Sequence, residues 1–219
     1  MEGFELRDYV ENGVLVQRTS GTTLRNLIAD HTGEYGLFVV KSSQVVIERS
    51  DAIGASDTGI YVGQSSDVVV RESEATENVS GFEIENSSRV TLVDNHAHGN
   101  TAGILVFVLP DLEVKEGKDN VVRGNLVEGN NLANFAAEEE IVSNVPSGTG
   151  ILIMAADRTE VTGNQIRDNN SVGIAVIGLR ELLPGREQFD VGTESEGNRI
   201  HDNRLEGNAP ATIQAIVDA

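Results

Sequence analysis

Two glutamates two positions apart, Glu83 and Glu85, are the acidic residues of this sequence best placed to do chemistry together. They lie in the segment Gly-Phe-Glu-Ile-Glu, where apolar and acidic residues alternate. This alternation is typical of a β-strand, and it puts both carboxylates on one face. Paired carboxylates can act as general acid and general base, for instance on a glycosidic bond. The same pair can equally be the solvated edge of an apolar surface.

His96 and His98 are a second candidate, because two histidines two positions apart on a strand can supply half of a metal site. Glu74 and Asp94 are the nearest sources of a third ligand. Two ligands without a defined third do not by themselves make a metal site. We therefore interpret both histidines as polar surface residues in a turn.

The remaining chemistry-bearing patterns give no site. The acidic clusters at 138–140 and 194–196 offer oxygen ligands for Ca²⁺, but they lack the alternation and sharp glycine turn of a calcium loop. Phosphate-loop, dinucleotide, nucleophile-elbow and zinc-protease motifs are absent. Without cysteine, disulfides and thiolate catalysis are excluded. The sequence thus predicts no metal and no cofactor, and it leaves any catalytic residue unknown.

The strands that would position these residues repeat along the chain. A glycine followed by alternating apolar residues recurs at spacings of 23, 23, 22, 22, 47 and 23 residues, at Gly13, Gly36, Gly59, Gly81, Gly103, Gly150 and Gly173. The interval of 47 holds one copy of each later landmark, so it reads as one coil with extra loop. We expect the repeated glycine to supply backbone angles that other residues resist.

Polar turn residues recur in phase with the strands. Two series of asparagines follow the repeat, at Asn95, Asn125, Asn164 and Asn203, and at Asn78, Asn100, Asn130, Asn169 and Asn208. A unit of roughly 22 residues cannot bury an apolar face alone, but stacked units share a continuous core and can bond asparagines into ladders. The sequence predicts an all-β fold, a single-stranded right-handed parallel β-helix of about seven or eight coils.

The repeated units GIYV, GILV, GILI and GIAV and the turns DNHAHGN, RGNLVEGN, TGNQIRDN and HDNRLEGN resemble those of parallel β-helix repeat proteins. This group includes the pectate-lyase-like, carbohydrate-associated right-handed β-helices, and the resemblance covers about Gly13 to Asn208. It implies a periplasmic or secreted location. It also implies that a lyase or epimerase of uronic-acid polymers would carry a basic residue beside acidic Ca²⁺ ligands on the first-strand face, and a hydrolase several aspartates. The corresponding columns here hold no Lys, Arg, His or Asp.

We expect one domain over residues 1–219, with loop insertions at about 108–118, 131–149 and 179–197 that all flank a first strand. The inward side of these strands carries Ile60, Val62, Phe82 and Ile84, with Ile174 and Val176 continuing the column. The outward side is too apolar for a solvated sheet, so insertions, a second subunit or a ligand must cover it. The predicted ligand- or partner-binding residues are Phe38, Tyr61, Glu83, Glu85, Leu105, Phe107 and Met154.

The net charge is −19, from 35 acidic and 16 basic residues, and it disfavours nucleic acid and anionic lipid as partners. No apolar run is long enough to span a membrane, and the N-terminus lacks the basic and apolar regions of a signal peptide. We predict a soluble domain that binds a saccharide or a protein surface through its first-strand sheet. The alternatives are a polysaccharide lyase, epimerase or hydrolase acting on a uronic-acid-type polymer, and a structural module that associates through the same sheet.

Overall fold

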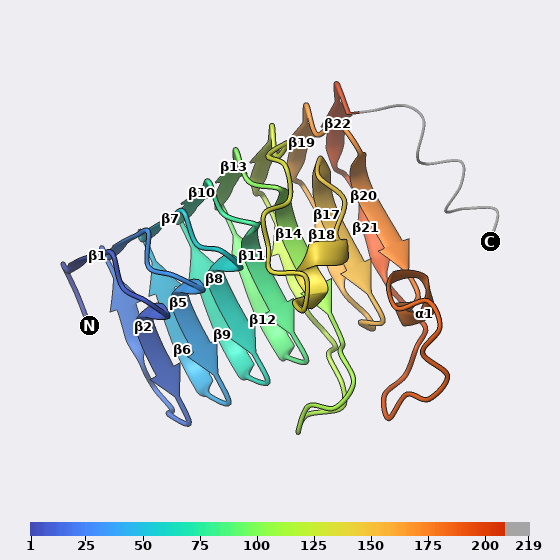
Figure 1. The fold of residues 1–219 in the computed structure, drawn as a ribbon, viewed down its shortest axis with the longest axis horizontal. Helices are drawn as coiled ribbons and strands as arrows, with labels where there is room; N and C mark the ends of the chain where they lie inside the picture. The colour runs from blue at the N-terminus through green and yellow to red at the C-terminus, as the bar shows by residue number, and fades with distance from the viewer. Residues whose placement is uncertain (209–219) are drawn as a thin grey trace.

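The computed structural model describes residues 1–208, and it is a right-handed parallel β-helix whose coils stack along one axis (Figure 1). Each coil gives one strand to each of three sheets, and neighbouring strands pair in parallel. The predicted fold class is therefore confirmed. The 47-residue interval is a single coil, because only β15 and β16 lie between β14 and β17.

The first sheet carries the glycine-led strands. It consists of β2 (Asn12–Gln17), β5 (Tyr35–Val40), β8 (Thr58–Gly63), β11 (Ser80–Glu85), β14 (Ala102–Phe107), β17 (Thr149–Met154) and β20 (Val172–Ile177). The second sheet consists of β3 (Thr23–Arg25), β6 (Ser43–Glu48), β9 (Ser66–Arg71), β12 (Ser88–Val93), β15 (Val121–Arg123), β18 (Glu160–Thr162) and β21 (Arg199–His201). The third consists of β1 (Glu5–Arg7), β4 (Ile28–Asp30), β7 (Asp51–Ile53), β10 (Glu74–Thr76), β13 (His96–His98), β16 (Leu126–Glu128), β19 (Gln165–Arg167) and β22 (Arg204–Glu206).

The inward columns of the first sheet form the core in the predicted register. Ile84 pairs with Val62 on one side and Val106 on the other, and all three side chains are fully buried. Ile174 and Val176 continue the column but are only half-buried. Within residues 1–208 their strand, β20, is the last of the first sheet, and its strand neighbour there is β17.

The recurring glycines have a different role from the predicted one. None of the seven adopts a positive φ, so unusual backbone angles are not the reason for them. Each faces the next coil at very short range instead. A Cβ on Gly36 would lie 2.4 Å from the carbonyl oxygen of Gly59, and one on Gly150 would lie 2.4 Å from that of Gly173. Only glycine allows the coils to approach this closely.

Both asparagine series form ladders, as predicted. The Nδ2 of Asn95 donates to Oδ1 of Asn125 at 3.0 Å, and Asn125 donates in the same way to Asn164 at 3.0 Å. Asn125 also donates to the carbonyl of Leu92 at 3.1 Å and accepts from the backbone amide of Asn95. Each amide thus bonds the turn above and the turn below, which satisfies polar groups inside the solenoid.

Three long segments leave the coils beside the first sheet (Figure 1). They are residues 108–120; residues 129–148, with the short 3₁₀ helix η1 (Ile141–Asn144); and residues 178–198, with the short helix α1 (Leu179–Leu182). Val142, Val145 and Leu179 from these segments are buried in the main apolar cluster. The insertions therefore pack over much of the outer face of the first sheet, which is one of the three covers considered from the sequence.

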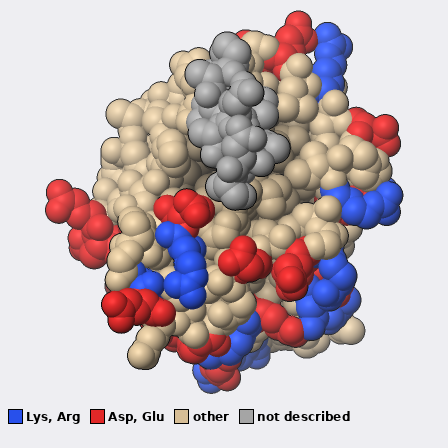
Figure 2. Space-filling view, turned by 90° about the vertical axis from the view of Figure 1, so that its right-hand side faces the viewer, with Lys and Arg blue, Asp and Glu red and all other residues tan. Residues whose placement is uncertain are grey.

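Most charged side chains lie at the surface, and Glu48, Asp57 and Glu83 are buried exceptions. In the view onto the C-terminal end of the solenoid, acidic and basic residues lie intermixed along the lower and right-hand rim (Figure 2). Many of them form ion pairs between coils, such as Arg158 with Asp119 at 2.7 Å and Arg89 with Asp67 at 2.7 Å. No helix within residues 1–208 is long and apolar enough to cross a membrane.

Candidate functional site

A cavity of about 440 Å³ lies on the outer face of the first sheet, over β5, β8 and β11. Its floor is formed by outer columns in register, in which Phe38 pairs with Tyr61 and Tyr61 with Glu83. Leu109 and Leu112 of one insertion line it, together with residues 139–142 of another. The cavity is therefore built by strands of early coils and by loops that leave later coils.

Three aromatic rings form one side of the cavity. The rings of Tyr35 and Phe38 stack with centroids 4.4 Å apart, and Tyr61 lies 5.0 Å from Tyr35 and 4.9 Å from Phe38. Tyr61 can lie flat along the sheet because its neighbour in the outer column is Gly63, where a Cβ would meet the Tyr61 hydroxyl at 2.2 Å. Tyr35 and Phe38 are partly exposed and line the cavity, so the cluster presents an aromatic surface to it.

Asp57 and Glu83 meet through a single hydroxyl group. The Oγ1 of Thr58 lies 2.9 Å from Oδ1 of Asp57 and 2.7 Å from Oε2 of Glu83. One hydroxyl has one proton and can donate it to only one of the two carboxyl groups. A protonated carboxyl group can donate to the same hydroxyl oxygen, so the arrangement favours protonation of one of the two acids.

Burial favours the protonated forms of these acids. Desolvation is the main cause that raises the pKa of Glu83 well above its usual value, and it raises the pKa of Asp57 to about 6. It also raises the pKa of Glu85 to about 7, although Glu85 accepts a hydrogen bond from the Tyr61 hydroxyl at 2.6 Å. The cavity therefore holds carboxyl groups that exchange protons near neutral pH, as general acids and bases do.

Two further acids, Glu34 and Glu140, lie close to Asp57. One carboxylate oxygen each of Glu34, Asp57 and Glu140 lies within 4.8 Å of the other two. Burial, and then the nearby charge of Glu140, raise the pKa of Glu34. Among the described residues that line the cavity there is no Lys, Arg or His. Its electrostatic potential is therefore strongly negative whenever these groups ionise.

The predicted site residues divide into two groups. Phe38, Tyr61, Glu83 and Glu85 line the cavity. The other three, Leu105, Phe107 and Met154, lie in the predicted columns but are at most 1% exposed, because the insertions cover them. These three support the sheet beside the cavity and do not face it.

Sequence reasoning missed Tyr35, Asp57, Thr58 and the loop acid Glu140. Tyr35 and Phe38 are three positions apart, so strict alternation would place them on opposite faces, yet their rings stack. Alternation breaks at Gly36, because a Cβ there would point toward the core residue Ala52. Tyr35 therefore lies on the outer face with Phe38. The sequence did hold a signal for two of these residues, because Tyr35 and Thr58 each directly precede one of the recurring strand glycines. Glu140 lies in an insertion with no periodic pattern, so nothing in the sequence placed it there.

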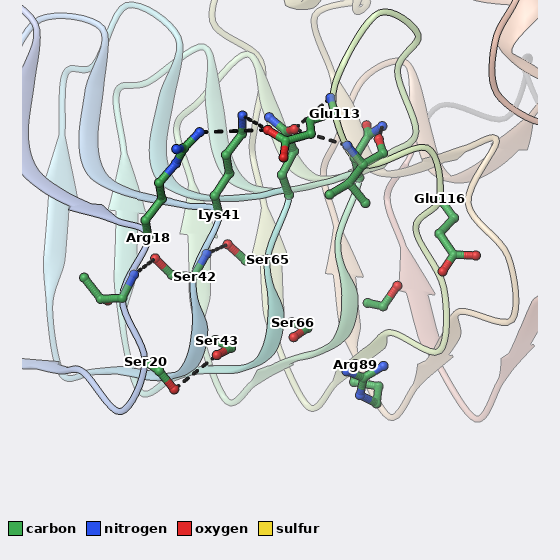
Figure 3. Close-up of a pocket in the computed structure, with 15 residues that line it drawn as sticks. Arg18, Ser20, Lys41, Ser42, Ser43, Ser65, Ser66, Arg89, Glu113 and Glu116 are labelled. Carbon is green, nitrogen blue, oxygen red and sulfur yellow. Dashed lines mark hydrogen bonds and ion pairs between the residues drawn. The ribbon is translucent and has the colours of Figure 1, made fainter.

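A second cavity of about 740 Å³ lies on the other side of residues 109–116 (Figure 3). Serines of successive coils line it. The hydroxyl of Ser42 accepts a hydrogen bond from the backbone amide of Thr19 at 3.1 Å, and the backbone amide of Ser42 donates to the hydroxyl of Ser65 at 3.0 Å. Its cations are already paired: Lys41 with Glu113 at 2.5 Å, and Arg18 with Glu113 at 3.9 Å. This groove offers hydroxyl groups but little net positive charge.

Comparison with known proteins supports the fold. The family model described as "Right handed beta helix region" matches residues 5–108, and the one described as "Periplasmic copper-binding protein (NosD)" matches residues 111–216. No curated protein matches the chain. The predicted resemblance to parallel β-helix repeat proteins is thus confirmed.

Solved structures of the same architecture include a periplasmic alginate epimerase, with a TM-score of 0.65 and 15% identity over 90% of this chain and 47% of that one. The A-module of a mannuronan C-5 epimerase of Azotobacter vinelandii gives 0.59 and 16% over 92% and 61%. The tailspike of E. coli bacteriophage HK620, in complex with a pentasaccharide, gives 0.51 and 14% over 96% and 43%. The chain spans about half the length of the first of these, and such identities establish the fold alone.

Proposed function

We propose that this chain is a saccharide-binding β-helix domain, and that the cavity over β5, β8 and β11 receives a neutral or amine-bearing sugar unit. The observation that carries this proposal is the combination of an aromatic surface with buried carboxyl groups in one cavity. Sugar rings have an apolar face that packs on aromatic rings, and hydroxyl groups that bond to carboxylates. The volume of about 440 Å³ is within the range of small-molecule sites.

The charge of the cavity supports a choice among sugars. The similar solved structures include epimerases named for alginate and mannuronan. A uronate ligand would bring its own carboxylate into a cavity lined by Asp57, Glu83, Glu85 and Glu140, with no cation among the described lining residues. Like charges at short range repel, and more strongly where water is excluded. A neutral sugar avoids this repulsion, and an amino sugar gains attraction.

A second candidate function is glycoside hydrolysis, which the Thr58 bridge favours. Asp57 and Glu83 share one hydroxyl, and burial gives one of them a proton near neutral pH. A hydrolase needs one protonated and one ionised carboxyl group beside the scissile bond. A lyase or epimerase that acts on uronates needs a cation to neutralise the substrate carboxylate, and the residues within 1–208 that line this cavity supply none.

A binding experiment tests the proposal directly. Neutral, amino and uronic oligosaccharides are titrated into the full chain by calorimetry after an array screen. We expect binding of a neutral or amino sugar, and none of alginate oligomers. Phe38→Ala removes half of a stacked pair and should weaken binding at least tenfold. Ile28→Ala, at an exposed apolar residue on the third sheet, should leave binding unchanged.

Two results would count against this assignment. Binding of uronate oligomers that survives Phe38→Ala would move the site to the serine-lined groove with Arg18 and Lys41. Equal loss in Phe38→Ala and Ile28→Ala would deny that the cavity is the site. Reducing-end release from the bound sugar that disappears in Glu83→Gln would add hydrolysis, and binding without turnover would restrict the function to recognition.

The proposal also includes a location and an association state. A periplasmic or extracellular location is supported by the family model for a periplasmic protein and by the periplasmic epimerase. Association through the first sheet stays a prediction. Most of the apolar surface that suggested it is covered by the insertions of the chain itself.

A further inference from the structure

Two histidines stand on the outer face of the third sheet, away from the cavity. His96 and His98 flank the buried Ala97 on β13, and their rings stack with centroids 4.2 Å apart. Both side chains are about one-third exposed, at 32% and 34%. A strand holds both rings on one face, so this pair needs little reorganisation to bind a common partner.

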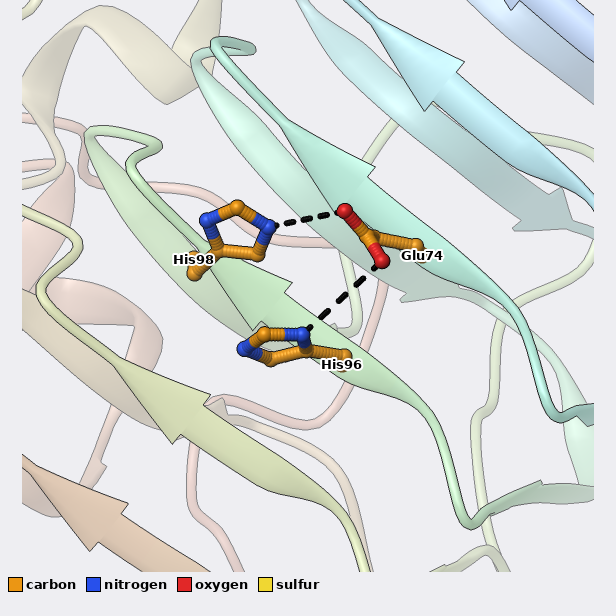
Figure 4. A group of neighbouring side chains, drawn as sticks. All are labelled: Glu74, His96 and His98. Atoms are coloured by element: carbon orange, nitrogen blue, oxygen red, sulfur yellow. Dashed lines mark hydrogen bonds and ion pairs between the residues drawn. The ribbon is translucent and has the colours of Figure 1, made fainter.

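Glu74 of the neighbouring strand β10 reaches both rings (Figure 4). Its Oε1 lies 2.9 Å from Nε2 of His98, and its Oε2 lies 3.9 Å from Nδ1 of His96. One nitrogen of each ring and one oxygen of Glu74 all lie within 4.8 Å of one another. Ligand atoms about 2.0–2.2 Å from one ion lie about 4 Å or less from each other. Side-chain rotations that move these three atoms by about 1 Å would therefore bring them to bonding distance of a common ion.

The other side of His96 is fixed by a second carboxylate. Its Nε2 donates to Oε1 of Glu128 at 3.0 Å, and Arg167 holds Glu128 through an ion pair at 2.5 Å. A neutral imidazole has one N–H, so donation from Nε2 leaves a lone pair on Nδ1, toward Glu74. A carboxylate that orients a histidine in this way is the usual outer partner of a metal ligand.

We infer that Glu74, His96 and His98 form a binding site for a first-row divalent ion such as Zn²⁺ or Cu²⁺, with Glu128 as a positioning residue. Two imidazole nitrogens and one carboxylate oxygen are the donor set that such ions prefer, whereas Ca²⁺ and Mg²⁺ prefer oxygen alone. The ion would take the place of the proton that His98 shares with Glu74. The outward side of the site faces solvent, which leaves room for water or an external ligand.

His201 provides a matched control within the chain. It also lies between two carboxylates, with Nε2 3.0 Å from Glu160 and Nδ1 2.8 Å from Asp202. It differs in having no second histidine beside it. The fourth histidine of the chain, His31, directly follows β4 and is hydrogen-bonded to Asp30. If carboxylate-paired histidines alone bound metal, both places would bind equally well.

The test titrates Zn²⁺ into the chelator-treated full chain by calorimetry and records the electron paramagnetic resonance spectrum with Cu²⁺. We expect one tight ion per chain, and nitrogen couplings from two imidazoles. His96→Ala and His98→Ala should each weaken Zn²⁺ binding at least tenfold, and Glu128→Gln by about tenfold. His201→Ala should change nothing. Circular dichroism of each metal-free variant checks that the fold is intact.

Several outcomes would overturn the inference. One is a wild-type affinity no greater than that of the double variant His96→Ala/His98→Ala. Another is a Cu²⁺ spectrum with oxygen ligands only, which would mean that the acidic surface binds cations without a built site. Equal weakening by His201→Ala would have the same meaning. Because the readouts need no saccharide, failure here leaves the proposed cavity function untouched.

Discussion

The hydroxyl of Thr58 joins two carboxyl groups that would repel each other if both were ionised. Keeping one of them protonated is therefore part of the folded state. Acids whose pKa is higher in the folded chain than in the unfolded chain stabilise the fold below their unfolded pKa. That stability is lost as the pH rises through the folded pKa.

We predict that the free energy of unfolding falls between pH 5 and pH 8, because Asp57 and Glu85 have pKa values of about 6 and about 7 and must ionise while buried. Glu85→Gln should reduce this fall by on the order of 2 kcal/mol. Urea unfolding at both pH values measures it. Glu181→Gln, on the exposed side of α1, should leave the pH dependence as it is. Stability that rises toward pH 8 would refute the buried-acid interpretation.

Single residues were also the scale at which the sequence predicted least. Glu83 and Glu85 were identified because two-residue periodicity places them together. Their partners Thr58 and Asp57 were not, because the strand glycine breaks that periodicity. Glu74 and the two histidines were considered together, but only the register of β10 against β13 brings the carboxylate between the rings.

Buried asparagines and close-packed glycines stabilise the strands and turns of each coil, as the apolar core residues do. Asn125 makes hydrogen bonds to both neighbouring turns from a buried position. We predict that Asn125→Ala lowers the free energy of unfolding by about 1–3 kcal/mol, because its former partners stay buried without hydrogen bonds. Thermal or urea unfolding measures it, and the exposed Asn144→Ala serves as control. Equal stabilities of the two variants would mean that the ladder contributes nothing.

Close approach of the coils gives a second prediction at this scale. Gly36→Ala places a methyl group 2.4 Å from the carbonyl of Gly59, so the two coils must separate. We expect a loss of roughly 1–3 kcal/mol or more from overpacking. Gly192→Ala is a matched control, because nothing lies within 4 Å of the added atom and its φ is ordinary. An unchanged melting temperature in Gly36→Ala would contradict the close-approach explanation.

The strands and turns were predictable because each is repeated in phase, so an error in one coil would conflict with the others. The reason for the glycines was not predictable. A sequence shows where glycine recurs, but the distance to the next coil appears only once the coils are stacked. The insertions have no repeat, and their packing over Leu105 and Phe107 could be anticipated only as one of three alternatives.

The molecule as a whole is a stack in which each coil contacts mainly its neighbours, so position along the axis decides what a residue contributes. Ile84→Ala, in the middle of the stack and fully buried, should cost about 2–4 kcal/mol through lost burial and a cavity. Ile174→Ala lies on the same face of β20, the last strand of the first sheet within residues 1–208; it is half-buried and should cost clearly less. Chemical denaturation of both variants checks this, and equal losses would mean that the register or the stack end is misassigned.

The cavity joins residues made at different times during synthesis. Its floor, from Tyr35 to Glu85, is complete before the chain reaches Leu109, and its opposite wall needs Glu140 and Val142. If the coils form in the order of synthesis, the aromatic and acidic floor stays bare until the later loops emerge, and Gln64 and Asn86 then fasten the first of them, residues 108–120. Ligand recognition is thus a late step of biosynthesis, and the loops that complete it can diverge between descendants while the repeat beneath them stays the same.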